Sequence, residues 1–234
     1  MNTNTHATLA NNAWSVADLL RGDYKQSDYG KVILPFTVLR RLECVLEPTR
    51  AKVSETYEQR RGQDINLEKF LRKASGHSFY NISGYTLKTV TNDSTQVAKH
   101  LTAYIGAFSE NAQEVLEKYD FAQQIKRLDG AGLLYRVVGR FADLDLRPFK
   151  LDADGKRVEV VSNHQMGYVF EDLIRRFAEL SNETAGEHFT PREVIELMVN
   201  LLIAPDDDAL SVPGVFRSVF DPACGTGGML SAAE

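Results

Sequence analysis

A glycine-rich stretch near the end of the sequence has the composition of a ligand-binding turn. It reads Asp-Pro-Ala-Cys-Gly-Thr-Gly-Gly-Met-Leu over residues 221–230, and it follows an apolar run at 215–220. A strand, a glycine turn and a helix bring backbone N–H groups close to a nucleotide-like ligand, because glycine has no Cβ to obstruct the approach. The carboxylate of Asp221, at the end of the predicted strand, would meet an ammonium group of that ligand. A purely structural tight turn would contain the same glycines.

A second polar stretch, Gly-Glu-His-Phe-Thr-Pro-Arg at 186–192, leads into a predicted helix. We expect Thr190 to be its N-cap, Pro191 to occupy the first helical position and Glu193 to close a capping box. These local roles leave the preceding Glu-His pair unexplained. The free N–H groups of the helix start, together with the phenylalanine ring, would flank a bound cofactor.

Most of the remaining sequence shows the three–four apolar spacing of helices. The expected helices cover 14–20, 28–46, 49–61, 67–75, 94–108, 110–118, 121–128, 133–144, 162–177 and 190–202. Asp28 is the expected cap of the second of these, and Pro35 lies inside it. Ser162 and Gln165 predict a capping box for the helix at 162–177. The helix at 190–202 has one apolar face, formed by Val194, Leu197, Met198, Leu201 and Leu202.

The organisation predicted from these elements has three parts. Residues 1–12 are polar and are expected to be a disordered tail. The turn-rich segment at 151–156 marks a boundary, so 13–152 would be a helical N-terminal domain and 153–234 the first elements of an α/β domain.

Composition excludes several classes of protein. A net charge of −5 argues against a self-sufficient nucleic-acid binder, and the basic pairs Arg60-Arg61 and Arg175-Arg176 are typical of solvated faces. The two cysteines, Cys44 and Cys224, form neither a disulfide framework nor a zinc site, so no metal is expected. No secretory signal or membrane span is evident, and we expect a cytoplasmic protein without membrane contact.

Taken together, the two polar stretches resemble the amino-group DNA methyltransferases, and more closely the methylation (M) subunit of type I restriction–modification systems. Three further segments are similar to the helical domain of that subunit: Asn12-Ala13-Trp14, Leu19–Gly22 and Tyr29–Pro35. The resemblance covers about residues 12–234. It implies a mainly α N-terminal domain followed by the start of a Rossmann-like, S-adenosylmethionine-dependent methyltransferase domain.

The resemblance also implies where S-adenosyl-L-methionine binds. The loop at 187–192 would line the methionine end of the cofactor, with Thr190 as a polar contact. The glycine-rich stretch at 221–228 would contact the ammonium group of the cofactor through Asp221, and the cofactor atoms near it through the backbone of the glycine turn. The implied cofactor-binding residues are Glu187, His188, Phe189, Thr190, Pro191, Arg192, Asp221, Pro222, Gly225, Thr226, Gly227 and Gly228.

The reaction implied by the resemblance is methyl transfer to the exocyclic amine of an adenine flipped out of DNA. The family performs it with a tetrapeptide, Asn/Asp-Pro-Pro-Tyr/Phe, but these 234 residues contain no adjacent prolines. We therefore assign no catalytic residue. The chain is interpreted as an N-terminal piece of a longer enzyme or a truncated product, which is expected to be inactive alone.

The implied partners are DNA, a DNA-specificity subunit, a nuclease subunit and a second M subunit. A different interpretation is a non-catalytic helical assembly module that docks on the specificity subunit. An unrelated nucleotide- or NAD-binding enzyme is a third interpretation, but the glycine spacing is not the G-x-G-x-x-G pattern of such sites.

Overall fold

The computed structural model describes residues 3–180, 190–212, 214–215, 217–224 and 227–233, and it contains two compact units. One, the helical unit, comprises Asn11–Val161. The other, the C-terminal unit, comprises Ser162–Glu234 together with Met1–Ala10. Within the described ranges, no helix combines the length and the hydropathy needed to cross a bilayer.

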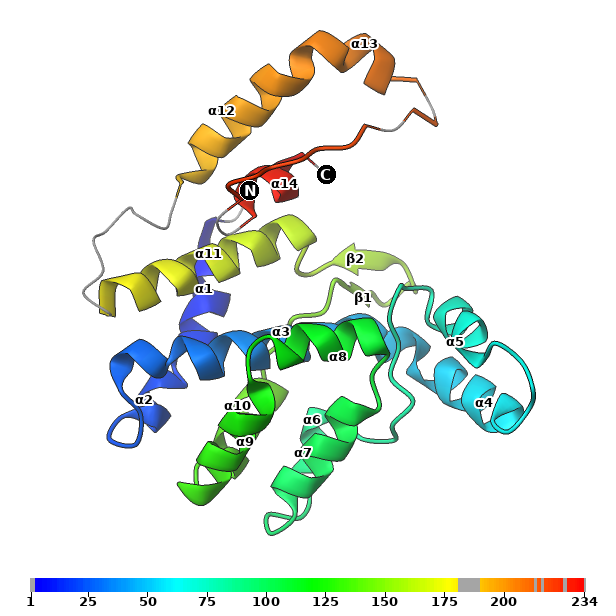
Figure 1. Ribbon diagram of the computed structural model, residues 1–234, viewed down its shortest axis with the longest axis vertical. Coiled ribbons are helices and arrows are strands. Elements are labelled where there is room, and N and C mark those ends of the chain that lie inside the picture. Colours follow the sequence, from blue (N-terminus) through cyan, green and yellow to red (C-terminus); the bar gives the residue numbers. More distant parts are fainter. Residues whose placement is uncertain (1–2, 181–189, 213, 216, 225–226, 234) are drawn as a thin grey trace. The chain divides into compact units, whose positions relative to one another are not determined.

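The helical unit is built from short helices and a single hairpin (Figure 1). Its elements are α2 (Ala17–Leu20), η1 (Gln26–Asp28), α3 (Gly30–Leu46), η2 (Glu47–Thr49), α4 (Arg50–Arg60), α5 (Leu67–Ser75), α6 (Leu87–Val90), α7 (Val97–Gly106), α8 (Glu110–Glu117), α9 (Phe121–Gly130), α10 (Leu134–Ala142), β1 (Phe149–Leu151) and β2 (Arg157–Glu159). Helix α1 (Thr3–Trp14) precedes them and spans the division between the units.

Helix α3 is the centre of the helical unit's core. Phe36 of this helix is fully buried. Its ring packs edge-on against the Phe121 ring of α9 at 4.7 Å and stacks on the Phe141 ring of α10 at 5.1 Å, both distances being between ring centroids. Such pairs add to the stabilisation from apolar burial. The helix predicted at 28–46 is confirmed over Gly30–Leu46, and Pro35 lies inside it.

The predicted cap of α3 is wrong. Tyr29 occupies the N-cap and makes no side-chain cap hydrogen bond. The Asp28 carboxylate instead accepts from Lys31 at 2.8 Å and pairs with Arg127 of α9 at 3.4 Å. The hydrogen bond from Lys31 is the largest cause that lowers the pKa of Asp28. An ion pair with a distant helix therefore replaces the local cap that the sequence pattern indicated.

A buried carboxylate ties α3 to a short helix that periodicity did not predict. Glu43 is 3% exposed, and its Oε1 accepts the backbone N–H of Leu87, the first residue of α6, at 2.8 Å. Its Oε2 pairs with Arg40, and Arg50 lies 3.7 Å from Oε1. A four-residue helix such as α6 shows no full period of apolar spacing, so its sequence did not indicate it. In the structure it has a capping box at Thr86 and packs against α7 and α10.

The boundary between the units lies later than the turn at 151–156 indicates. That turn joins β1 and β2, which pair antiparallel with Lys150 opposite Val158. The N–H of Val161 then donates to the carbonyl of Arg147, and Arg41 of α3 donates to the carbonyl of Val161 at 3.0 Å. The hairpin is therefore held to the helical unit, and the division falls after Val161.

The N-terminal segment also differs from its prediction. Residues 3–14 form helix α1, whereas composition predicted a disordered tail over 1–12. The small side chains of Ala10 and Ala13 are buried, and alanine has the highest helix propensity. The predicted helix at 14–20 is divided between the end of α1 and α2.

The C-terminal unit contains α11 (Asn163–Leu180), α12 (Arg192–Ile203), η3 (Ala204–Asp206), α13 (Asp207–Leu210) and α14 (Gly228–Ala232). The capping box of α11 is confirmed. The N–H of Ser162 donates to Oε1 of Gln165 at 2.8 Å, and the N–H of Gln165 donates to the Ser162 hydroxyl at 3.1 Å. Met166, Val169 and Leu173 form its buried stripe, as their spacing predicted.

Candidate functional site

The structure describes about half of the predicted cofactor-binding residues. Glu187, His188, Phe189, Gly225 and Thr226 lie outside the described residues, and so does the side chain of Arg192. The site is therefore built from the start of α12 and from the two ends of the glycine turn.

Helix α12 begins at Arg192, with Pro191 rather than Thr190 at the N-cap. Proline has no side-chain acceptor, so the predicted capping box with Glu193 is wrong at this helix start. The carbonyl of Pro191 accepts the N–H groups of Val194 and Ile195, both at 3.0 Å. The first two helical N–H groups, of Arg192 and Glu193, have no partner among the described residues. They form a donor pair at the end of the predicted first loop.

The second loop is a tight turn in its described parts. The Asp221 Oδ1 atom accepts the N–H of Ala223 at 3.0 Å, and the N–H of Gly227 donates to the carbonyl of Cys224 at 2.7 Å. Gly227 has a φ of +78°, which favours glycine, and it precedes the first residue of α14. The Asp221 carboxylate accepts no other hydrogen bond from the described residues.

The predicted strand before this turn is not present. Residues 215 and 217–220 carry no strand, because no neighbouring strand pairs with them in the part of the chain that the structure describes. The hairpin β1–β2 forms the only sheet in these ranges. The α/β character of the second domain therefore stays a prediction.

One contact brings the two loops together. Helices α12 and α14 pack against each other, and a Cβ added to Gly228 would overlap the Cδ1 atom of Ile195. Ile195 is 5% exposed and lies in the first turns of α12, close to the first loop. The backbone after the glycine turn thus approaches α12 more closely than a side chain would permit. Sequence reasoning missed Ile195, although Gly228 directly after the turn was a signal of close approach.

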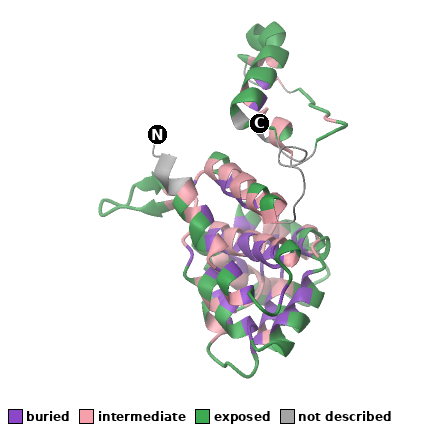
Figure 2. Ribbon diagram, turned by 90° about the vertical axis from the view of Figure 1, so that its left-hand side faces the viewer, coloured by how far each residue is buried: buried purple, intermediate pink, exposed green. Residues whose placement is uncertain are grey.

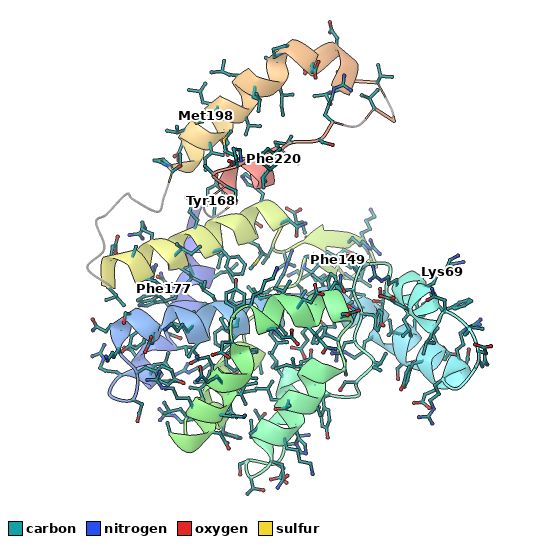
Figure 3. The ribbon with its side chains drawn as sticks, viewed as in Figure 1. Lys69, Phe149, Tyr168, Phe177, Met198 and Phe220 are labelled. Atoms are coloured by element: carbon teal, nitrogen blue, oxygen red, sulfur yellow. The ribbon has the colours of Figure 1, made fainter. Side chains whose placement is uncertain are left out.

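The same part of the unit presents an exposed apolar surface. On α12 the predicted apolar face is exposed, from Val194 at 45% to Leu201 at 66%, and Phe220 before the turn is 86% exposed. Figure 2 shows most of α12 in the colour of exposed residues, and Figure 3 labels Met198 and Phe220. Contiguous exposed apolar residues usually mark an interface. The described residues contain nothing that covers this face.

A polar contact on the other side of α12 was also missed. The Nε2 atom of His164, in the first turn of α11, lies 3.9 Å from Oε1 of Glu196, and its ring meets Tyr168 edge-on at 4.9 Å. The His164 and Glu196 side chains are about half exposed. This pair connects the starts of α11 and α12. No cluster of three metal-ligating side chains occurs among the described residues.

Comparisons with known proteins identify the family of the chain. The family model described as HsdM N-terminal domain matches residues 9–141, and the one described as N-6 DNA Methylase matches residues 161–234. The chain is 28% identical over 235 residues to the Type I restriction enzyme MjaIX methylase subunit of Methanocaldococcus jannaschii. The match covers 95% of this chain and 38% of that protein.

Two further relatives have related names. The Type I restriction enzyme EcoEI methylase subunit of Escherichia coli is 29% identical over 63% of this chain and 25% of its own length. The Type I restriction enzyme HindI methylase subunit of Haemophilus influenzae is 31% identical over 35% of this chain and 16% of its own length. The chain thus spans about two fifths or less of each of these curated relatives. Because the HsdM model alone matches more than half of the sequence, the chain belongs to the family of type I restriction–modification methylase (M) subunits and corresponds to its N-terminal part.

Proposed function

We propose that this chain supplies the helical domain and part of the cofactor site of an enzyme that methylates adenine in DNA. In this proposal the methyl group comes from S-adenosyl-L-methionine and goes to the exocyclic amine of a flipped adenine. The observation that supports it most is the contact between Ile195 and Gly228, which joins the helix after the first predicted loop to the helix after the second.

The described residues fit such a cofactor. One oxygen of the Asp221 carboxylate accepts from Ala223, and the second would accept from the ammonium group. A charge-assisted hydrogen bond of this kind is about twice as strong as a neutral one. The backbone N–H groups of Arg192 and Glu193, which have no partner among the described residues, suit the carboxylate of the methionine moiety, since a helix start favours negative charge.

The remaining predicted contacts complete the proposal. Glu187, His188 and Phe189 would approach the methionine end with Thr190 and Pro191. Pro222, Gly225, Thr226, Gly227 and Gly228 would shape the turn, with Gly227 in the left-handed conformation that glycine adopts without strain. The bound cofactor would supply the activated methyl group, while these residues bind and orient it.

We assign no catalytic residue to these 234 residues. They contain no adjacent prolines and therefore no Asn/Asp-Pro-Pro-Tyr/Phe tetrapeptide. We propose that the 234-residue chain alone transfers no methyl group. The proposed partners of the whole enzyme are DNA, a DNA-specificity subunit, a nuclease subunit and a second M subunit.

The test is a transfer assay with tritiated S-adenosylmethionine and duplex DNA, followed by digestion and detection of N6-methyladenine. A full-length M subunit that carries this region, assembled with its specificity subunit, should label adenine. The chain of 234 residues should give no label above background. Label in cytosine, or none in the assembled enzyme, contradicts the proposed reaction.

A second candidate is a helical assembly module that docks on the specificity subunit without chemistry. The observation that favours it is the separate core of the helical unit, Asn11–Val161. Both candidates co-purify with the specificity subunit, so cofactor binding is the measurement that separates them. A module of this kind binds no S-adenosylmethionine with or without Asp221→Ala, whereas the first candidate binds it and loses affinity in Asp221→Ala.

A further inference from the structure

A pocket lies between helices α7, α8 and α9 of the helical unit. Its volume is about 260 Å³, and its apolar wall is formed by Ile105 of α7, Leu116 of α8, and Phe121 and Ile125 of α9. Sites for drug-sized molecules are roughly 300–1,000 Å³. The pocket lies just below that range, so it suits an apolar side chain of a partner better than a cofactor.

Leu116, Phe121 and Ile125 are only 1–4% exposed, so they form a packed floor that is fixed by the core of the helical unit. The surface that a partner would touch comes from the more exposed lining residues Thr102, Ile105 and Ala122. The side chain of Gln113 donates to the carbonyls of Gly106 at 3.2 Å and Phe108 at 2.5 Å. These bonds hold the end of α7 against α8 at the rim.

The charges around the pocket have one sign. The two charged residues that line it are Glu117 and Asp120. On α8, Glu110 and Glu114 continue the acidic rim, because positions i, i+4 and i+7 lie on one side of a helix. All four carboxylates are exposed, and none forms an ion pair within the part of the chain that the structure describes. The lysine and arginine residues of these helices and of the α8 C-cap, Lys99, Lys118, Lys126 and Arg127, do not line the pocket.

We propose that this pocket docks a basic amphipathic segment of a partner protein. One leucine- or phenylalanine-like side chain enters the pocket, and lysine or arginine residues on the same segment pair with the acidic rim. The rim from Glu110 to Glu117 extends for about 10 Å along α8 at 1.5 Å per residue. A peptide segment spaces several cations over that distance, whereas a small amine does not. The proposal does not depend on the cofactor site, which lies in the other unit.

The probe is a fluorescein-labelled synthetic helix of leucine and lysine at three–four spacing, and its matched control has glutamate in place of lysine. Fluorescence anisotropy measures the binding of each peptide to the 234-residue chain at low salt. The lysine peptide should bind, with an affinity that falls as salt is added, and the glutamate peptide should not bind.

Two pairs of variants locate the binding. Ala122 is exposed and lines the pocket, so Ala122→Trp fills it, while Ala51→Trp places the same side chain on the exposed surface of α4. We expect Ala122→Trp to weaken peptide binding roughly tenfold or more, since it excludes the apolar anchor, and Ala51→Trp to leave it unchanged. Glu117→Lys and Glu55→Lys change the net charge equally, but only the first should weaken binding several-fold.

Circular dichroism is the control that checks whether each variant keeps its helical content. The proposal is overturned by either of two results. One is that the lysine peptide shows no binding up to about 1 mM. The other is that each pocket variant and its control bind the peptide with the same affinity, which would mean that general charge attraction accounts for binding.

Discussion

The contact between Gly228 and Ile195 gives a quantitative prediction about the loop arrangement. Gly228 has no positive φ, so alanine is compatible with its backbone, but the new Cβ would overlap the Cδ1 atom of Ile195. Overpacking of this kind costs about 1–3 kcal/mol, while replacing glycine by alanine in a helix recovers about 0.5–1 kcal/mol. We expect Gly228→Ala to destabilise the α12–α14 contact by about 1 kcal/mol, because Cδ1 is the end of a flexible side chain and moves in part.

The matched partner variant is Ile195→Val, which removes the overlapping atom and no other. By itself it should cost about 0.5–1.5 kcal/mol. The next Ile195 atom, Cγ1, lies 3.7 Å from the added Cβ, which is an ordinary contact. In the valine background, Gly228→Ala should therefore be neutral or slightly stabilising. The double-mutant cycle isolates this coupling.

Hydrogen exchange measured by mass spectrometry on peptides from α12 and α14 reports the local stability directly. Gly227→Ala serves as control, because at a φ of +78° its strain of about 1–2 kcal/mol is independent of Ile195. The reasoning is refuted if Gly228→Ala has the same effect in both backgrounds. It is equally refuted if Ile195→Val rescues Gly227→Ala.

Three further predictions concern the folded chain. Glu43→Ala should destabilise the helical unit by about 3–5 kcal/mol in urea unfolding, because it leaves the Leu87 N–H and Arg40 without their buried partner. An unchanged midpoint of urea unfolding would refute this. Asp28→Asn should cost about 0.2–1 kcal/mol at pH 7. The pKa of Asp28 is lower in the folded chain than in the unfolded chain. Its contribution to the free energy of unfolding is therefore complete above about pH 4 and is lost as the pH falls through the folded pKa. The parent and the variant should therefore have the same stability in acid. A constant difference from pH 7 to acid would contradict it. Ser162→Ala should remove about 1 kcal/mol from the start of α11, seen as faster exchange there but not in α3.

Local sequence signals were reliable at the start of α11 and the end of α5, but not at the start of α12, where the predicted capping box of Thr190 and Glu193 is not formed. Ser162 and Gln165 are three residues apart, and the capping box that they indicate is formed. The helix end at Gly76, with a φ of +72°, and the central helix α3 were likewise visible from the sequence. In each case the residues that define the feature are neighbours in the chain.

Signals that depend on distant partners were not reliable. Asp28 has the side chain of a cap but pairs with Arg127, and the turn at 151–156 belongs to a hairpin that Arg41 holds to α3. The apolar run at 215–220 has strand composition, yet a strand exists only when another strand pairs with it. For the candidate site, spacing indicated the two loops, while the contact at Ile195 required the packing of α12 on α14.

The central claim is that the loops at 186–192 and 221–228 bind S-adenosylmethionine. Saturation-transfer difference NMR with S-adenosylhomocysteine tests it on the 234-residue chain, because this method detects affinities as weak as about 1 mM. The account predicts transfer to the ligand that S-adenosylmethionine competes away and ATP does not. It also predicts a marked loss of transfer in Asp221→Ala and none in Asp64→Ala, a matched exposed carboxylate of the helical unit. No transfer, or equal transfer in the Asp221→Ala variant, would contradict the account.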